Sequence, residues 1–416
     1  MLFMDIFSER RQTLLESFKE NSIAILFGSE EMIRNGDVNF PFRQNSNFSY
    51  LTNFPESQSI AILKENDFFI FCKEKNKLKE QWDGEIIGPD NVKRFGATKG
   101  MALKDFQTNL LEITKDISNI YCFDSSISKL KRILPDYEND FLSLDLEVSK
   151  MRSIKSNEEL ELIKKACNIS SLAHMRAMRS VQPGMYEYQL EAEYLHEFMS
   201  HGARACAYPS IVGGGKNSCV LHYNDNKDLL NDGELVLVDA GCEYKNYASD
   251  ITRTFPINGK FSKPQREIYE IVLEASEKSI EQVVPGSNPL KAHDESVRII
   301  SQGLKDLGLL EGDLNEIIET KKYFNFYMHR VGHYLGLDVH DVGGKKENGE
   351  WTDYVPGMIT TIEPGIYINN SLNVPDKYKN IGIRIEDNVL VSENSFEVLT
   401  DLVPKKIKDI EALMDT

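Results

Sequence analysis

The chain has 416 residues, of which 41% are hydrophobic and 27% charged, and its 48 basic and 65 acidic side chains give a net charge of −17. This length exceeds what one hydrophobic core usually supports, so we expect two domains. The acidic balance argues against a nucleic-acid partner, which needs a basic surface. No stretch approaches the roughly 20 apolar residues of a membrane span, so we expect no membrane partner.

The six cysteines are spread singly, with no C-x-x-C pair. This spacing excludes zinc-ribbon and thioredoxin-like motifs. The first residues are amphipathic and lack the basic-then-apolar layout of a signal peptide. We therefore expect a cytoplasmic protein with reduced thiols.

The first part of the chain, residues 1–152, has the pattern of a small α/β domain. Its predicted strands span residues 22–27, 58–64, 68–73 and 119–123. The second and third of these are expected to form a hairpin, and a helix should follow through residues 129–134. We interpret the mixed-charge run 73–80 as a solvated connection.

The pattern changes near residue 152, where we place the start of a second domain, residues 153–416. Ser156, followed by Glu158 and Glu159, has the signature of a helix start, because acids in the first turn interact favourably with the helix dipole.

Two stretches of this second part share one sequence frame, Gly233–Gly241 and Gly357–Gly365. Each consists of a glycine, five mostly apolar residues, a carboxylate, a spacer and a second glycine. Pro183-Gly184 and Pro285-Gly286 each precede a long amphipathic helical pattern upstream of the frame. The period of roughly 100 residues is too long for a solenoid, so we predict a duplicated half-domain with a pseudo-twofold axis. The alternative is coincidence between two strand-turn segments.

Carboxylates recur at strand ends in this duplicated part. Asp239 closes an apolar strand, and Asp250 opens an alternating one, with residues 240–249 free to form a hairpin between them. Glu363 ends the second copy of the frame. Arg384 and Glu386 share one face of a period-two segment. His333 lies in the nearby histidine-rich segment 329–341.

Four carboxylates and one imidazole would require cations if they met. Two unit charges 4 Å apart repel by about 4 kcal/mol at an effective dielectric of 20, and four acids make six pairs. Two divalent ions would neutralise them, and oxygen-rich ligation with one histidine favours Mn²⁺, with Co²⁺ or Zn²⁺ as alternatives.

Each residue also has a simpler interpretation. Asp239 could be a turn residue, Asp250 and Glu386 could face solvent, and His340 could form a surface pair with Asp341. His329 and His333 are spaced i, i+4, as zinc ligands on a helix are, but no H-E-x-x-H motif is present.

The flanks of Asp239, Asp250, His333, Glu363 and Glu386 resemble the metal-ligand motifs of the pita-bread metallopeptidases. Within that family the chain is similar to the Xaa-Pro aminopeptidase (aminopeptidase P) branch. The resemblance extends over nearly the whole chain and is carried by the stretches 41–46, 50–52, 211–223, 239–244, 249–255, 337–341 and 361–367. One departure is Arg330-Val331-Gly332, where the resemblance leads us to expect smaller, more apolar residues beginning with glycine. Arg330 could alter the substrate cleft or point to solvent.

The resemblance implies an α+β protein, with a C-terminal pita-bread fold of duplicated halves and a smaller N-terminal creatinase-like α/β domain. It implies hydrolysis of the Xaa–Pro bond at a peptide N-terminus by a hydroxide that bridges two metal ions. Glu363 would shuttle the proton, assisted by His340 and His222. His222, His329, His340 and Arg384 would bind substrate. It also implies a homo-dimer or homo-tetramer, with Trp82 and Asp37 as candidates for shaping a neighbour's cleft.

Rival hypotheses remain at this stage. Prolidase has the same metal set but prefers Xaa-Pro dipeptides, whose carboxylate needs a cationic partner. Methionine aminopeptidase normally lacks so large an N-terminal domain. Some pita-bread proteins have lost their metals and act as amidinohydrolases or binding modules.

Overall fold

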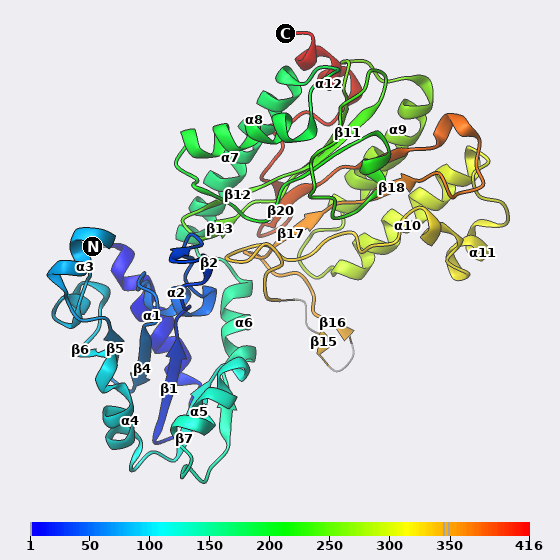
Figure 1. Ribbon diagram of the computed structural model, residues 1–416. Coiled ribbons are helices and arrows are strands. Elements are labelled where there is room, and N and C mark those ends of the chain that lie inside the picture. Colours follow the sequence, from blue (N-terminus) through cyan, green and yellow to red (C-terminus); the bar gives the residue numbers. More distant parts are fainter. Residues whose placement is uncertain (1, 344–345, 348–349) are drawn as a thin grey trace. The chain divides into compact units, whose positions relative to one another are not determined.

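The computed structural model describes residues 2–343, 346–347 and 350–416 (Figure 1). The chain divides into two compact units, Met1–Met151 (unit 1) and Arg152–Thr416 (unit 2). Among the described residues, no helix combines the length and apolarity that crossing a bilayer demands.

Unit 1 is built on a six-stranded mixed sheet in the order β6-β5-β4-β1-β7-β8. β1 pairs antiparallel with β4 and parallel with β7. The strands of this unit are β1 (Ser22–Phe27), β2 (Ile33–Asn35), β3 (Val38–Asn39), β4 (Ile60–Lys64), β5 (Asp67–Cys72), β6 (Lys99–Ala102), β7 (Asn119–Cys122) and β8 (Phe141–Ser143). Its helices are α1 (Leu2–Glu16), α2 (Ser46–Thr52), α3 (Lys77–Asp83), α4 (Phe106–Thr114) and α5 (Ile127–Ile133), while α6 (Asp145–Ser153) runs into unit 2.

The strands expected in unit 1 are present. β4 and β5 form the predicted hairpin, with Lys64 opposite Asp67 across a two-residue turn. Residues 73–80 are exposed or half-buried, as a solvated connection should be, but the segment includes the start of a helix, because α3 begins at Lys77. The Asn76 side chain accepts hydrogen bonds from the backbone N–H groups of Leu78 and Lys79 and so caps this helix. None of the helix's residues is buried, as the charge pattern indicates.

Unit 2 repeats one arrangement twice. In the first half β11 (Leu235–Asp239) pairs with β14 (Thr252–Pro256), and β12 (Cys242–Tyr244) pairs with β13 (Tyr247–Ala248). In the second half β17 (Ile359–Ile362) pairs with β20 (Asp387–Val391), and β18 (Gly365–Ile368) pairs with β19 (Ile381–Arg384). All four pairings are antiparallel. The same strand order and pairing in both halves confirm the predicted duplication.

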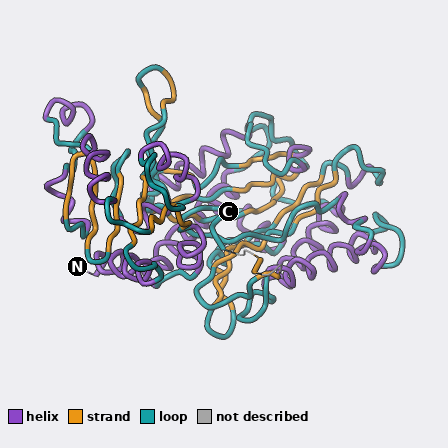
Figure 2. Tube along the Cα trace, turned by 90° about the horizontal axis from the view of Figure 1, so that it is seen from below, coloured by secondary structure: helices purple, strands orange, loops and turns teal. Residues whose placement is uncertain are grey.

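Each half of unit 2 also begins with a pair of packed helices, α7 with α8 and α9 with α10. Figure 1 shows the strands between the two helix pairs, and the turned view in Figure 2 shows helices and strands as separate layers. The helices of this unit are α7 (Asn157–Ser180), α8 (Glu187–Ser200), α9 (Lys263–Ile280), α10 (Pro289–Asp306), α11 (Leu314–Glu319) and α12 (Ile407–Met414). The remaining strands are β9 (Ala205–Cys206), β10 (Ile211–Gly214), β15 (Lys346–Glu347), β16 (Glu350–Trp351) and β21 (Phe396–Val398).

Local sequence signals explain where these elements begin. α7 starts with the expected capping box, in which Ser156 and Glu159 each bond the other's backbone N–H. The glycines that open the two copies of the frame, Gly233 and Gly357, have φ values of 77° and 91°. This left-handed backbone favours glycine and turns the chain directly into β11 and β17.

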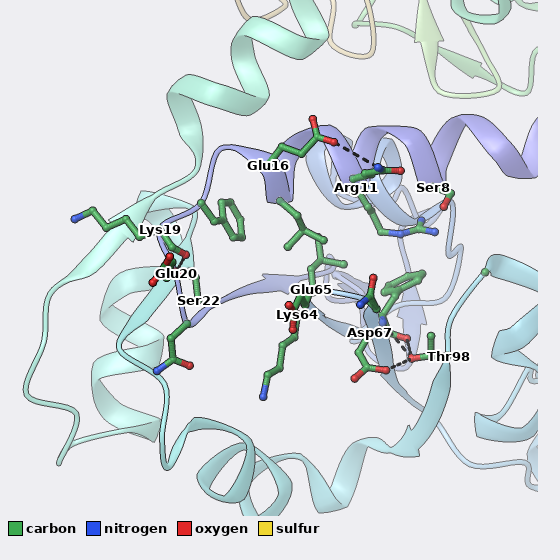
Figure 3. Close-up of a pocket in the computed structure, with 18 residues that line it drawn as sticks. Ser8, Arg11, Glu16, Lys19, Glu20, Ser22, Lys64, Glu65, Asp67 and Thr98 are labelled. Atoms are coloured by element: carbon green, nitrogen blue, oxygen red, sulfur yellow. Dashed lines mark hydrogen bonds between the residues drawn. The ribbon is translucent and has the colours of Figure 1, made fainter.

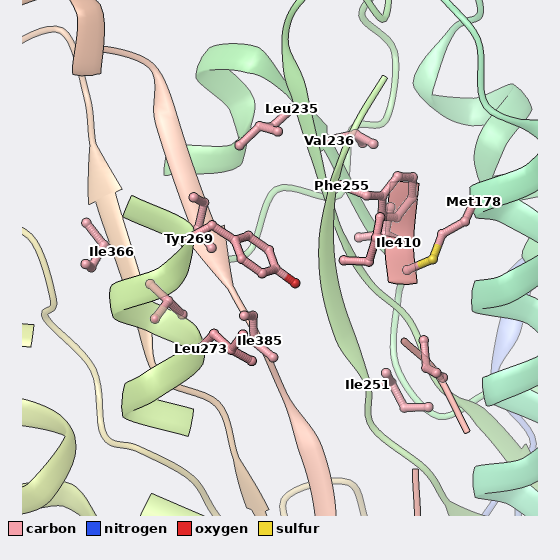
Figure 4. Packing of buried hydrophobic residues seen from close by; sticks show 14 of the residues in the cluster. Met178, Leu235, Val236, Ile251, Phe255, Tyr269, Leu273, Ile366, Ile385 and Ile410 are labelled. Atoms are coloured by element: carbon pink, nitrogen blue, oxygen red, sulfur yellow. The ribbon is translucent and has the colours of Figure 1, made fainter. Parts of the chain in front are cut away.

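One hydrophobic core joins the two halves of unit 2. Met178 of α7, Phe255 of β14, Tyr269 of α9 and Ile366 of β18 are all buried in it. Figure 4 shows these side chains together with Ile410 from α12. This core positions the ends of β11 and β14, while β17 and β20 pack in a second buried cluster that includes Ile362 and Val389.

Candidate metal centre

A cavity of about 630 Å³ lies in unit 2 and receives side chains from both of its halves. All nine unit-2 residues singled out from the sequence line it. They are His222, Asp239, Asp250, His329, His333, His340, Glu363, Arg384 and Glu386.

The strand ends deliver the acids to this cavity. Asp239 is the last residue of β11, and Glu363 comes directly after β17. Glu386 comes directly before β20, and Asp250 lies two residues before β14. β11 pairs with β14, and β17 pairs with β20. Each half therefore contributes two carboxylates, one from each strand of its pair. The period-two segment is divided between β19 and β20 at residues 385–386, but Arg384 and Glu386 still face the same cavity.

Three of the expected ligands meet closely. Ligand atoms of Asp250, His333 and Glu386 all lie within 4.8 Å of one another, a spacing that could hold a metal ion. Nε2 of His333 is 3.4 Å from Oδ2 of Asp250 and 3.5 Å from Oε1 of Glu363. Glu363 therefore adjoins the same cluster.

Asp239 joins the cluster through shared hydrogen bonds. The Tyr208 hydroxyl lies 2.6 Å from Oδ1 of Asp239 and 2.5 Å from Oδ1 of Asp250. Nη2 of Arg384 is 2.7 Å from the other oxygen of Asp239. The predicted hairpin between Asp239 and Asp250 thus brings the two carboxylates to one tyrosine.

Burial and mutual repulsion perturb these acids strongly. Burial raises the pKa of Glu386 well above its usual range, and the charges of Asp250 and Glu363 raise it further. Burial also raises the pKa of Glu363 to about 7, although His333 and Arg384 oppose it. Asp239 differs, because Arg384 and Tyr208 outweigh burial and hold its pKa below the ordinary value. The protein's own cations therefore neutralise only part of the cluster.

His333 is oriented as a metal ligand. Its Nδ1 lies 3.0 Å from the backbone oxygen of Tyr334, which can only accept, so Nδ1 carries the hydrogen. When the ring is neutral, as it is in a metal ligand, the lone pair of Nε2 is directed towards the acids, because the carbonyl holds the hydrogen on Nδ1. Oxygen donors from four carboxylates and one imidazole nitrogen fit divalent cations.

A hydrogen-bonded chain lines another side of the cavity. Nη1 of Arg384 donates to the Tyr367 hydroxyl at 2.9 Å, and this hydroxyl lies 2.9 Å from Nε2 of His329. Nδ1 of His329 faces the Arg330 carbonyl at 2.7 Å. Burial and the charge of Arg384 lower the pKa of His329 to about 3, so its ring is neutral. The more exposed His340 stacks edge-on against His333, with ring centroids 4.3 Å apart.

The structure adds polar residues to which the sequence analysis gave no role. The Thr252 hydroxyl donates to Oε2 of Glu386 at 2.7 Å and accepts from Nε of Arg384. The Asn388 side chain accepts from the Asp250 N–H and donates to the Asp250 carbonyl. Thr252 and Asn388 each follow a candidate ligand by two residues, and this same-face spacing is a signal that could have found them. Tyr208 and Tyr367 carry no such signal.

The two candidate inter-subunit residues belong to unit 1 and are not among the described residues that line this cavity. Trp82 lies on α3 with 87% of its surface exposed, and Asp37 lies in the turn between β2 and β3.

Unit 1 has a hollow of its own, of about 800 Å³, beside α1 and the β4–β5 turn (Figure 3). Its lining is polar and of mixed charge, including Arg11, Lys64 and Asp67, and among the described residues it contains neither histidine nor cysteine. The unit-2 cavity is therefore the stronger candidate for catalysis despite its smaller volume.

Comparison with known proteins agrees with this geometry. Residues 161–393 match the model of metallopeptidase family M24, and residues 7–121 match that of the aminopeptidase P N-terminal domain. The chain is 44% identical to the Xaa-Pro aminopeptidase of Haemophilus influenzae, over 98% of this chain and 97% of that protein. It is 41% identical to the Escherichia coli Xaa-Pro aminopeptidase with the same coverage.

A solved structure shares the whole fold. The structure of Pseudomonas aeruginosa aminopeptidase PepP superposes with a TM-score of 0.96 at 42% identity, covering 99% of this chain and 98% of that one. The N-terminal domain match favours the aminopeptidase P branch over prolidase. With both domains matched and carboxylates clustered as a metallopeptidase requires, the chain belongs to the aminopeptidase P branch of the M24 metallopeptidase family.

Proposed function

We propose that this protein releases the N-terminal residue of peptides whose second residue is proline. The observation that carries the proposal is the convergence of Asp250, His333 and Glu386, with Glu363 and Asp239 adjoining, in one cavity of a chain that matches the family in both domains. An Xaa–Pro bond is a tertiary amide without an N–H, and the proline ring restricts the backbone, so ordinary peptidase clefts fit it poorly.

Asp239, Asp250, His333, Glu363 and Glu386 would hold two divalent ions, whose +4 charge balances the four carboxylates. We assign Mn²⁺ as the preferred ion, because oxygen donors dominate the set. When bound, such ions supply an activated water and polarise the scissile carbonyl.

The protein's own residues would position the peptide and move its protons. Asp239, ionised beside Arg384, would anchor the substrate's α-amine. Glu363, with a pKa of about 7, can both accept and return a proton near neutral pH. His222, His329 and His340 would orient the substrate and stabilise the developing oxyanion.

Prolidase is the second candidate function. Arg330 lines this cavity, and its positive charge could hold the carboxylate of a dipeptide. The match to the aminopeptidase P N-terminal domain favours the first candidate.

We also propose self-association through unit 1. Apolar side chains are exposed around the β2–β3 hairpin and on α3, with Ile33 69% and Trp82 87% exposed. Covering such residues with a second copy of the chain would bury apolar surface. Asp37 at the hairpin turn and Trp82 would then be available to shape a neighbour's cleft, as the resemblance implies.

A cytoplasmic location is part of the proposal. Cys72, Cys122, Cys167 and Cys242 are buried free thiols, which suit a reducing compartment. Recovery of the protein with the membrane or extracellular fraction would contradict this location.

Substrate length tests the function directly. We expect turnover of an Xaa-Pro-Xaa tripeptide at a kcat/KM well above that of the matching Xaa-Pro dipeptide, because the amine anchor and not a terminal carboxylate defines the register. Quantified release of the first amino acid measures both rates. Turnover of the dipeptide alone would establish prolidase instead.

Metal binding should release protons from the metal-free protein. Burial lowers the pKa of His333, but the hydrogen bond to Asp250 and the charge of Glu363 outweigh burial and raise it to about 9. Because a metal ligates the neutral imidazole, apparent Mn²⁺ affinity should rise with pH up to about 9. Calorimetry in two buffers of different ionisation enthalpy would count the protons, with at least one expected at pH 7.

Metal content and activity complete this test. Chelation should abolish hydrolysis, and stepwise Mn²⁺ return should restore it as binding approaches two ions per chain. The exposed-side variant His201→Gln is the matched control and should release the same number of protons. Affinity independent of pH between 6 and 8 would argue against His333 as a ligand.

Replacing Glu363 should separate folding from chemistry. We expect Glu363→Ala to remain folded by circular dichroism while kcat falls by roughly 10²–10⁴-fold, the usual contribution of a general base. Glu397→Ala on β21, where Glu397 forms an ion pair with Lys164 at the surface, should keep wild-type kcat. Near-normal turnover of Glu363→Ala would remove this residue from the mechanism.

If unit 1 mediates self-association, substitutions in its exposed apolar residues should lower the mass of the assembly in solution. Sedimentation velocity should give a dimer or tetramer for the wild type and a shift towards monomer for an Ile33→Asn, Trp82→Ser double variant. Leu402→Ser, which alters an exposed apolar residue of unit 2, should leave the mass unchanged. A monomeric wild type at micromolar concentration would refute the proposal.

A further inference from the structure

A side pocket of about 310 Å³ adjoins the active-site cavity in unit 2. The two share three lining residues, Arg330, Gly332 and His333. Pro289 and Leu290, at the start of α10, contribute apolar walls. A peptide bound in the main cavity could therefore direct one of its groups into this pocket.

Arg330 places a positive charge where the side pocket meets the active-site cavity. Its side chain is exposed, and its guanidinium lies 5.6 Å from the ring centroid of Trp351, which also lines the side pocket. No carboxylate among the described residues lies within 4.0 Å of the Arg330 guanidinium. Stacking on an aromatic ring holds the guanidinium in place while leaving its edge free for an anion.

The other ionisable groups at the pocket do not cancel this charge. Asp341 is already paired, with Nη2 of Arg152 at 2.5 Å and Nζ of Lys155 at 3.2 Å. Burial and the charge of Arg330 lower the pKa of His293 to about 4, so this ring is neutral. Burial raises the pKa of Asp294 although the charge of Arg330 opposes it, and Asp294 does not line the pocket.

The position of the pocket indicates which part of a peptide would reach it. The amine anchor proposed above, Asp239, lies at the end of β11. It is held by Arg384 at the end of β19 and by Tyr208 between β9 and β10. The pocket instead opens beside His333 and Arg330, in the loop that leads to His340. A peptide whose amine is held at Asp239 must extend away from it, so its later residues are the ones available to the pocket.

We propose that Arg330 and this side pocket form a subsite that selects a carboxylate on the residue following proline. The carboxylate is either the side chain of an acidic third residue or the C-terminus of a tripeptide, since both present the same group to the guanidinium. This inference rests on the proposed Xaa-Pro aminopeptidase function. It gives a role to the residue at which the sequence departs from the family pattern.

Paired peptides measure the selection and separate its two sources. Ala-Pro-Glu-amide against Ala-Pro-Gln-amide tests the side chain, and Ala-Pro-Gly with a free C-terminus against its amide tests the terminal carboxylate. In each pair we expect the wild type to favour the charged peptide by about fivefold in kcat/KM, equivalent to ~1 kcal/mol. Glu-Pro-Gly-amide against Gln-Pro-Gly-amide tests whether the first residue is selected instead.

Variants of Arg330 identify the cation. Arg330→Met, which keeps an unbranched stem without charge, should bring the charged-to-neutral ratio to about one. Arg330→Glu should invert it, and Arg330→Lys should retain part of it. Arg298→Met is the matched control, because Arg298 lies on the surface of α10 paired with Glu295 and its loss changes the net charge equally. The control should keep the wild-type ratio.

The outcomes distinguish this inference from the proposed function. Equal rates within both pairs, or a ratio that Arg330→Met leaves unchanged, would overturn the subsite, and selection at the first residue would overturn its position. Absence of any Xaa-Pro hydrolysis would contradict the function itself. In that case, calorimetric binding of Pro-Glu-amide and Pro-Gln-amide to wild type and Arg330→Met still decides whether Arg330 binds a carboxylate.

Discussion

Mutual repulsion among four carboxylates is the constraint around which unit 2 is organised. Asp239, Asp250, Glu363 and Glu386 come from four strand ends and line one cavity. Arg384 forms an ion pair with Asp239, and His333 lies within ion-pair distance of Asp250 and Glu363. These two cations are fewer than the four acids. The remaining excess of negative charge contributes to the raised pKa values of Glu363 and Glu386, together with burial. A fold that retains such a cluster is stabilised when divalent cations bind, which links metal uptake to the native state.

The duplicated halves explain how the cluster is held despite this repulsion. Each half supplies the same pair of strands, and one hydrophobic core packs both halves into a single body. Backbone and side-chain bonds then cross between the halves at the cluster itself. The Asn388 side chain, from the second half, accepts a hydrogen bond from the backbone N–H of Asp250 in the first half. The Thr252 hydroxyl, from the first half, donates a hydrogen bond to Glu386 in the second. Neutral side chains therefore help to preorganise Asp250 and Glu386.

The same cavity combines a shared chemistry with local variation. The cavity brings together the residues that the resemblance to the metallopeptidase family singled out as ligands. Arg330 differs from the residue that the resemblance leads us to expect, and its guanidinium has no carboxylate partner within 4.0 Å among the described residues. Variation at such a rim position can alter the choice of peptide without disturbing the buried acids, since Arg330 contacts none of them through its side chain within ion-pair distance among the described residues.

The sequence by itself determined the duplicated frame, the strands that end in Asp239 and Glu363, the capping box at Ser156 and the shared face of Arg384 and Glu386. These features depend on local periodicity and turn chemistry, which neighbouring residues determine. Tertiary structure alone decided that Tyr208 bridges two acids and that Arg330 faces a side pocket next to Trp351. Such contacts join residues far apart in the chain, so no short pattern records them.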